Sequence, residues 1–115
     1  GVLCQRVIDL LGLSMTEGHS ILLGEYNIAH MVSRHPADFA LYGEYIPLIL
    51  AAPDYVALNA KDGSIEYVKE VQVNSVFVKV AVRVSARGQL FARSVYRLNT
   101  NRVLNFIEKG TLKRY

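Results

Sequence analysis

Every second residue from position 76 to position 84 is a valine, and the residues that alternate with them are Phe77, Lys79, Ala81, Arg83 and Ser85. Because successive side chains of a β-strand point to opposite faces of the sheet, this alternation places all the valines on one face. Such a face is stable only when it is buried. The sequence therefore predicts a strand over residues 76–85 whose valines belong to the core.

Strand patterns also flank this segment, over residues 54–59, 64–71 and 90–98. Turn residues separate them, at 61–63, 72–75 and 85–88, and the Asp-Gly pair at 62–63 is typical of a hairpin. The last strand has one face with Leu90, Ala92, Ser94, Tyr96 and Leu98 and another with Phe91, Arg93, Val95 and Arg97. Because neither face is wholly apolar, we expect one of them to line a concave surface.

The remainder of the chain has a helical period. Helices are expected over residues 2–13, 26–36 and 37–45, with a further short helix or a kink at Pro47 and a last amphipathic helix over 102–109. Residues 20–24 are expected to form a short strand or an extended lead-in, and residues 111–115 a basic tail. The predicted fold class is α+β: a single domain, 1–115, in which N-terminal helices pack on a four-stranded antiparallel β-meander, followed by a short C-terminal helix.

Composition argues against several classes of protein. A chain with 51% hydrophobic and 20% charged residues is a folded globular protein, and it contains no apolar run long enough to span a bilayer. The single Cys4 cannot form an internal disulfide and is expected to pack in the core. The three histidines lack the spacing of metal ligands, so we predict no metal site and no cofactor.

Charge is distributed unevenly along the chain. Residues 1–78 carry four basic and nine acidic side chains, whereas residues 79–115 carry nine basic side chains and one acidic. A basic segment of this kind indicates an anionic partner, most commonly nucleic acid. The alternative is a solvated sheet face followed by a basic tail.

The segment from Tyr26 to Pro36 contains the residues best suited to chemistry. In a helix, His30 and Arg34 share one face, while Ile28, Met31, Val32 and His35 share another. An imidazole can move a proton and a guanidinium can hold an anion, so we select His30 and Arg34. Roughly 140° separates His30 from His35 on a helix, so only one of them can point into a given pocket unless Pro36 ends the helix early and lets His35 turn round. The alternative is that each histidine is an ordinary half-buried residue.

Three features together resemble a known family: the segment from His30 to Pro36, the apolar helix that runs to Pro53 and Tyr55, and the strand that ends with Ser94, Val95 and Tyr96. With the order of elements, they resemble the barnase/EndoU/colicin/RelE-like nucleases, and most closely the phage and polymorphic-toxin branch of that family. The resemblance covers residues 20–115.

The resemblance implies a metal-independent ribonuclease that cleaves RNA, often tRNA, by attack of a ribose 2′-hydroxyl on the adjacent phosphorus. Such a reaction needs a base, an acid and cations that stabilise the phosphorane. The implied catalytic residues are His30, Arg34, Ser94, Tyr96, His35 and Lys69, and the implied RNA-phosphate ligands are Lys79, Arg83, Arg93 and Arg97. Glu25, Glu66 and Glu70 are all candidates for the general base.

The same resemblance implies a toxin domain that acts in the bacterial cytoplasm and is delivered as the C-terminal part of a secreted or surface-displayed protein, as in contact-dependent growth inhibition. Its expected partners are RNA and a cognate immunity protein with an acidic contact surface. No binding to a membrane is expected. Two other readings stay open. One is a non-catalytic RNA-binding or protein-interaction module, and the other is a phage structural domain.

Overall fold

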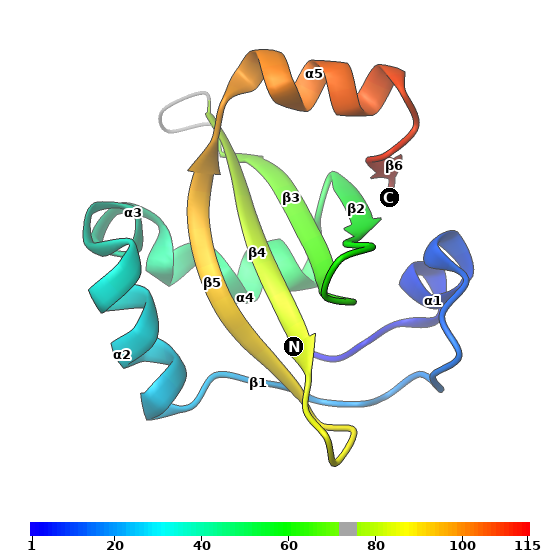
Figure 1. Ribbon diagram of the computed structural model, residues 1–115, viewed down its shortest axis with the longest axis horizontal. Coiled ribbons are helices and arrows are strands. Elements are labelled where there is room, and N and C mark those ends of the chain that lie inside the picture. The colour runs from blue at the N-terminus through cyan, green and yellow to red at the C-terminus, as the bar shows by residue number, and fades with distance from the viewer. Residues whose placement is uncertain (72–75) are drawn as a thin grey trace.

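The computed structural model describes residues 1–71 and 76–115, so the turn expected at 72–75 lies outside the described residues. A six-stranded sheet forms the centre of the molecule, with helices on both faces and beside one edge (Figure 1). The strands are β1 (Ile21–Leu22), β2 (Tyr55–Leu58), β3 (Ile65–Val71), β4 (Val76–Val84), β5 (Leu90–Leu98) and β6 (Lys113–Arg114). Their order across the sheet is β1-β5-β4-β3-β2-β6.

The α+β class is confirmed, but the expected four-stranded antiparallel meander is only part of the sheet. Strands β2 to β5 form that meander, β1 adds a parallel strand beside β5, and β6 adds an antiparallel strand beside β2. The expected basic tail at 111–115 is therefore partly wrong, because it contains an edge strand. Strands of two residues are too short to show an alternating pattern, and only their distant partners define them.

The helices are α1 (Gln5–Leu11), α2 (Glu25–Arg34), α3 (Pro36–Tyr42), α4 (Ile46–Ala51) and α5 (Thr100–Glu108), with a 3₁₀ turn, η1 (Gly43–Tyr45), between α3 and α4. Pro36 ends α2 and begins α3, since proline fits the first turn of a helix but not its interior. His35, between the two helices, has φ −139° and ψ 61°. This nonhelical backbone is the condition under which the sequence allowed His35 to turn away from its helical face.

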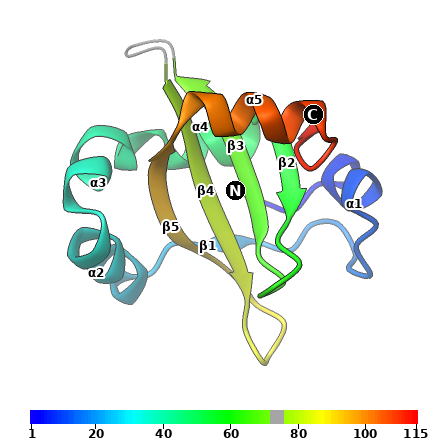
Figure 2. The same ribbon diagram turned by 45° about the horizontal axis from the view of Figure 1, so that its top comes forward.

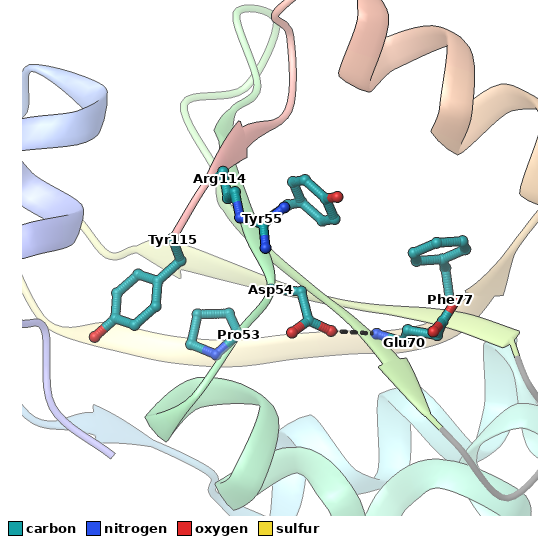
Figure 3. A pocket seen from close by; sticks show the side chains of 7 residues that line it. All are labelled: Pro53, Asp54, Tyr55, Glu70, Phe77, Arg114 and Tyr115. Carbon is teal, nitrogen blue, oxygen red and sulfur yellow. Dashed lines mark hydrogen bonds between the residues drawn. The ribbon is translucent and has the colours of Figure 1, made fainter.

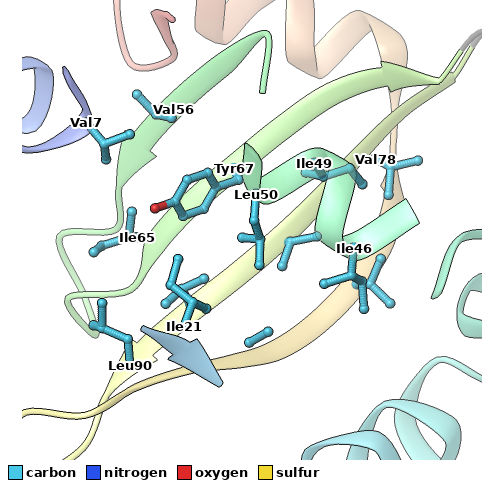
Figure 4. Close-up of a cluster of buried hydrophobic side chains, with 14 of the residues drawn as sticks. Val7, Ile21, Ile46, Ile49, Leu50, Val56, Ile65, Tyr67, Val78 and Leu90 are labelled. Carbon is cyan, nitrogen blue, oxygen red and sulfur yellow. The ribbon is translucent and has the colours of Figure 1, made fainter. Parts of the chain in front are cut away.

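The core lies between the valine face of β4 and helices α1 and α4. Val78, Val80 and Val82 are fully buried, as the alternation predicted, whereas Val84 at the end of the strand is 43% exposed. Figure 4 shows Ile46, Ile49 and Leu50 of α4 lying over the strands. A smaller apolar cluster lies on the opposite face, where α5 covers one end of the sheet: Ala57, Val68, Phe77, Val103 and Leu112. Figure 2 shows α5 in front of the strands and α4 behind them.

A β-bulge in β5 corrects the faces expected for that strand. Ala81 pairs with Ser94 but Val82 pairs with Ala92, which leaves Arg93 as an extra residue without an opposite partner. The alternation therefore changes phase at Arg93. Leu90, Ala92 and Val95 are buried on the valine side, while Ser94 and Tyr96 lie on the opposite face with Lys79 and Ala81. Strict period-two reasoning had placed Ser94 and Tyr96 with Leu90 and Ala92.

Candidate active site

The sheet face opposite the valines has a hollow at the end that α5 does not cover. Its volume is about 280 Å³, and the residues that line it are Asn59, Asp62, Ser64, Glu66, Lys79, Ala81, Arg83, Arg93, Ser94 and Tyr96. Strand register explains how these residues meet, because Glu66, Ala81 and Ser94 lie in one row across β3, β4 and β5, with Lys79 and Tyr96 paired in the next. Alanine in the middle of the row has no side chain beyond Cβ. The hollow thus opens between a carboxylate and a hydroxyl.

Glu66 and Lys79 form an ion pair at the base of the hollow. Lys79 Nζ lies 3.0 Å from Glu66 Oε2, and each side chain is only 15% exposed. Asn59 Nδ2 donates to the same oxygen at 3.4 Å. Both contacts use Oε2, so Oε1 is the carboxylate oxygen left to accept a proton from a ligand.

Lys79 also lies over the ring of Tyr96, with Nζ 4.9 Å from the ring centroid. Burial lowers the pKa of Lys79, but hydrogen bonding to Tyr96 and the charge of Glu66 outweigh burial, so the pKa is raised above its ordinary value. Lys79 therefore remains a cation at neutral pH. It can stabilise an anion in the hollow, but it is not a base.

His35 reaches this cluster from the junction of α2 and α3. Its ring stacks on Tyr96 with centroids 4.9 Å apart and an angle of 24° between the planes. The expected candidate, His30, is half-buried on α2, and no hydrogen bond, ion pair or ring contact of His30 is observed within residues 1–71 and 76–115. The catalytic role of His30 stays a prediction, and the geometry favours His35.

The other predicted cations are dispersed. Arg83 and Arg93 line the hollow, and Arg83 is held 3.6 Å from Asp62. Arg34 is exposed at the end of α2, and Arg97 is exposed on β5, where its backbone N–H donates to Asp38. Neither of these two arginines lines the hollow.

Lys69 lies on the opposite face of the sheet from the hollow. It pairs with Val78 across β3 and β4, donates to the carbonyl oxygen of Ala52 at 2.8 Å, and is 3.8 Å from Asp54 Oδ1. The sequence correctly grouped Lys69 with Tyr67 and Val71, and both of those residues are buried in the core. These contacts hold Lys69 against the end of α4, and its catalytic role stays a prediction.

Of the three candidate bases, Glu66 lies in the hollow with Ser94 and Tyr96. Glu70 lines a separate pocket of about 320 Å³ near the C-terminus, together with Asp54 and Tyr115 (Figure 3). Glu25 lines another hollow, at the start of α2. Sequence reasoning also missed Asn59 and Ala81. Ala81 follows from the register once Ser94 is placed opposite it, whereas Asn59 follows the end of β2 and reaches the hollow through its hydrogen bond to Glu66.

The described residues contain no group of three or more histidine, cysteine, aspartate or glutamate side chains placed to bind a metal ion. Within the same part of the chain, no helix is both long and apolar enough to cross a membrane.

A family model described as phage-Barnase-EndoU-ColicinE5/D-RelE like nuclease matches residues 1–105. No curated protein and no solved structure matches the chain. The family match confirms the nuclease resemblance noted in the sequence and extends it to the N-terminal residues that the resemblance had left out.

Proposed function

Because the chain belongs to the phage-Barnase-EndoU-ColicinE5/D-RelE like nuclease family, we propose that it is a metal-independent endoribonuclease that cleaves RNA by attack of a 2′-hydroxyl on the adjacent phosphorus. One observation supports this most strongly. A continuous series of contacts runs from His35 to Tyr96, from Tyr96 to Lys79 and from Lys79 to Glu66. Tyr96, Lys79 and Glu66 line one hollow with Ser94, and His35 joins them from outside that lining through its stacking on Tyr96.

The residues at the two ends of this series can transfer protons from and to the RNA. Glu66, through Oε1, accepts the proton of the attacking 2′-hydroxyl, and His35 donates a proton to the leaving 5′ oxygen. Imidazole is the side chain suited to this at neutral pH, and general acid–base catalysis of this kind contributes about 10²- to 10⁴-fold to a rate. The products are a 2′,3′-cyclic phosphate and a free 5′-hydroxyl.

The middle of the series stabilises charge. The cation of Lys79 and the guanidinium of Arg83 offset the negative charge that builds up on the phosphorane, and the hydroxyls of Ser94 and Tyr96 donate hydrogen bonds to its oxygens. A partly enclosed hollow makes these interactions stronger than they would be in water.

The experiment is RNA cleavage in EDTA by the purified protein and by substitutions of each histidine. We expect His35→Ala to lower kcat by about 10²- to 10⁴-fold, and His19→Ala, whose imidazole contacts Thr16 in the N-terminal connection, to leave it unchanged. His30→Ala shows whether His30, on α2, or His35, at the end of α2, is the catalytic histidine. Loss of cleavage in His30→Ala with full activity in His35→Ala would overturn the assignment.

Glu66→Gln and Glu70→Gln separate the candidate bases on β3. The first is expected to abolish most of the activity and the second to retain it. If the folded wild-type protein leaves total tRNA and mRNA uncut but binds them with an affinity that falls steeply with salt, the chain is a non-catalytic RNA-binding module instead.

We further propose that tRNA is the substrate class and that the domain is a toxin acting in the bacterial cytoplasm. The support is the family resemblance and the basic surface of the C-terminal half. A producing cell then needs an immunity protein, and an acidic face that covers Arg83 and Arg93 would complement the hollow. End-mapping of RNA from cells that express the domain identifies the substrate. Survival of such cells when they also express an acidic protein from the producing cell identifies the inhibitor.

A further inference from the structure

A second hollow adjoins the candidate active site. Its volume is about 580 Å³, and it lies between the start of α2 and the ends of β4 and β5 that meet at their hairpin. It shares Asp62, Arg83 and Arg93 with the first hollow, so the two lie side by side. Figure 1 shows α2 beside β5, which places the start of the helix at one wall of this space.

The lining of the second hollow differs in chemistry from that of the first. The first is lined mainly by charged and hydroxyl groups, whereas the second includes the rings of Tyr26 and Phe91 and the side chain of Val84. Tyr26 is 82% exposed, although it is a large aromatic residue on a helix with a buried face. Phe91 pairs with Arg83 across the strands, so an aromatic ring and a guanidinium lie next to each other where the hollows join.

We propose that this second hollow binds the base of a nucleotide that flanks the cleaved phosphate in single-stranded RNA. This inference rests on the function proposed above. The base stacks on Tyr26 or Phe91, while its phosphate contacts Arg83 and Arg93. Stacking on aromatic side chains is the usual way in which proteins hold unpaired RNA bases, and the volume lies in the range of roughly 300–1,000 Å³ typical of ligand sites.

Charge at the junction of the hollows favours this occupant. The residues that both hollows share are Arg83, Arg93 and Asp62, and Asp62 is already paired with Arg83. The other acidic residue of the second hollow, Glu25, lies at the start of α2, so the phosphate is assigned to the junction and the base to the aromatic part of the hollow. Arg93 is the extra residue of the bulge and is exposed, so its charge is directed to the surface between the hollows. An apolar peptide would leave that charge unpaired, whereas a nucleotide supplies both a flat ring and an anion.

Binding of a short 2′-fluoro RNA, which lacks the attacking hydroxyl, tests the proposal without any need for cleavage. We expect Tyr26→Ala to weaken binding by about 5- to 150-fold, which corresponds to the roughly 1–3 kcal/mol of base–aromatic stacking. Phe91→Ala is a second variant, checked for its fold by its unfolding transition. Leu104→Ala, an exposed apolar residue on α5, is the matched control and should bind like the wild type.

Abasic nucleotides identify the group that the hollow recognises. Each position of the RNA is replaced in turn, and one abasic position should weaken binding to the wild type but make little difference to Tyr26→Ala. If every abasic RNA loses the same affinity in both proteins, or if Tyr26→Ala and Phe91→Ala both bind like the wild type, the base site is wrong. If one abasic position weakens binding only in the wild type, as expected, but no RNA is ever cleaved, the base site stands and the catalytic proposal fails. If the wild type binds no RNA, both fail.

Discussion

The two ends of one sheet face show how the same strands can make a core or a reactive surface. At one end, Phe77 is buried against α5, as is Val68 in the next row along the strands. At the other end, Glu66 and Ala81 face the candidate active site, and Lys79, directly opposite Val68, marks the boundary between the two. The same strands, β3 and β4, form both ends of this face. The difference is that α5 covers one of them, so the polar groups at the uncovered end stay accessible to solvent and to a ligand.

The covered end should respond to substitution mainly in stability. Phe77 is 7% exposed, and its loss leaves a cavity under α5. We expect Phe77→Ala to lower the free energy of unfolding by about 3–5 kcal/mol, as measured by urea denaturation. The folded fraction should retain its activity on RNA.

The matched substitution at the open end is Ser94→Ala, which should change the free energy of unfolding by no more than about 0.5 kcal/mol but reduce cleavage. Equal losses of stability in both variants would show that the two ends are one cooperative core rather than a core and a site.

The sequence anticipated this division only in part. The valine alternation correctly predicted the buried face of β4, because a regular strand needs no information beyond its own period. The bulge at Arg93 depends on how β5 pairs with β4, so period two continued through it and gave Ser94 and Tyr96 the wrong neighbours. Val95, buried between two polar residues, was the one local signal of the change in phase.

The sequence favoured His30 over His35, and for a similar reason it could not show which of the two lies near the strand residues. Helical spacing separates His30 from His35 by about 140°, but it does not show which of the two faces the sheet. Pro36 gives His35 a nonhelical backbone. The imidazole of His35 then stacks on Tyr96, which lies on β5, about sixty residues further along the chain. Contacts of that sequence separation follow from the packing of α2 and α3 against β5, which no local pattern encodes.

The open end should respond to substitution mainly in activity. Lys79→Met keeps much of the side chain's bulk but removes the cation that faces the phosphate, and we expect kcat to fall by about 10²- to 10³-fold. Some stability will also be lost because Glu66 keeps a buried charge without its partner. Lys113→Met, on the exposed edge strand β6, removes an equal charge far from the hollow and should leave kcat unchanged. Full activity of Lys79→Met would remove this lysine from the mechanism.

The smallest expected effect concerns Asp62, which joins the two hollows. Hydrogen bonds from the side chain and then the backbone of Ser64 lower its pKa below the ordinary value of 3.8, and Arg83 adds to this. The folded protein therefore binds this proton more weakly than the unfolded chain does. The resulting stability is fully present above pH 3.8 and is lost as the pH falls through the lowered pKa.

Asp62→Asn keeps the oxygen that accepts the Ser64 N–H but removes the titration, so its unfolding free energy should decline less steeply than that of the wild type below pH 4. Urea denaturation between about pH 2.5 and about pH 5, the range over which a carboxyl group of this kind titrates, measures the two slopes. Because Asp62 also restrains Arg83, the same variant should leave that arginine free to contact a second phosphate and thus strengthen RNA binding slightly at neutral pH. Identical pH slopes together with unchanged binding would show that Asp62 shapes only its own turn and does not connect the site to the neighbouring hollow.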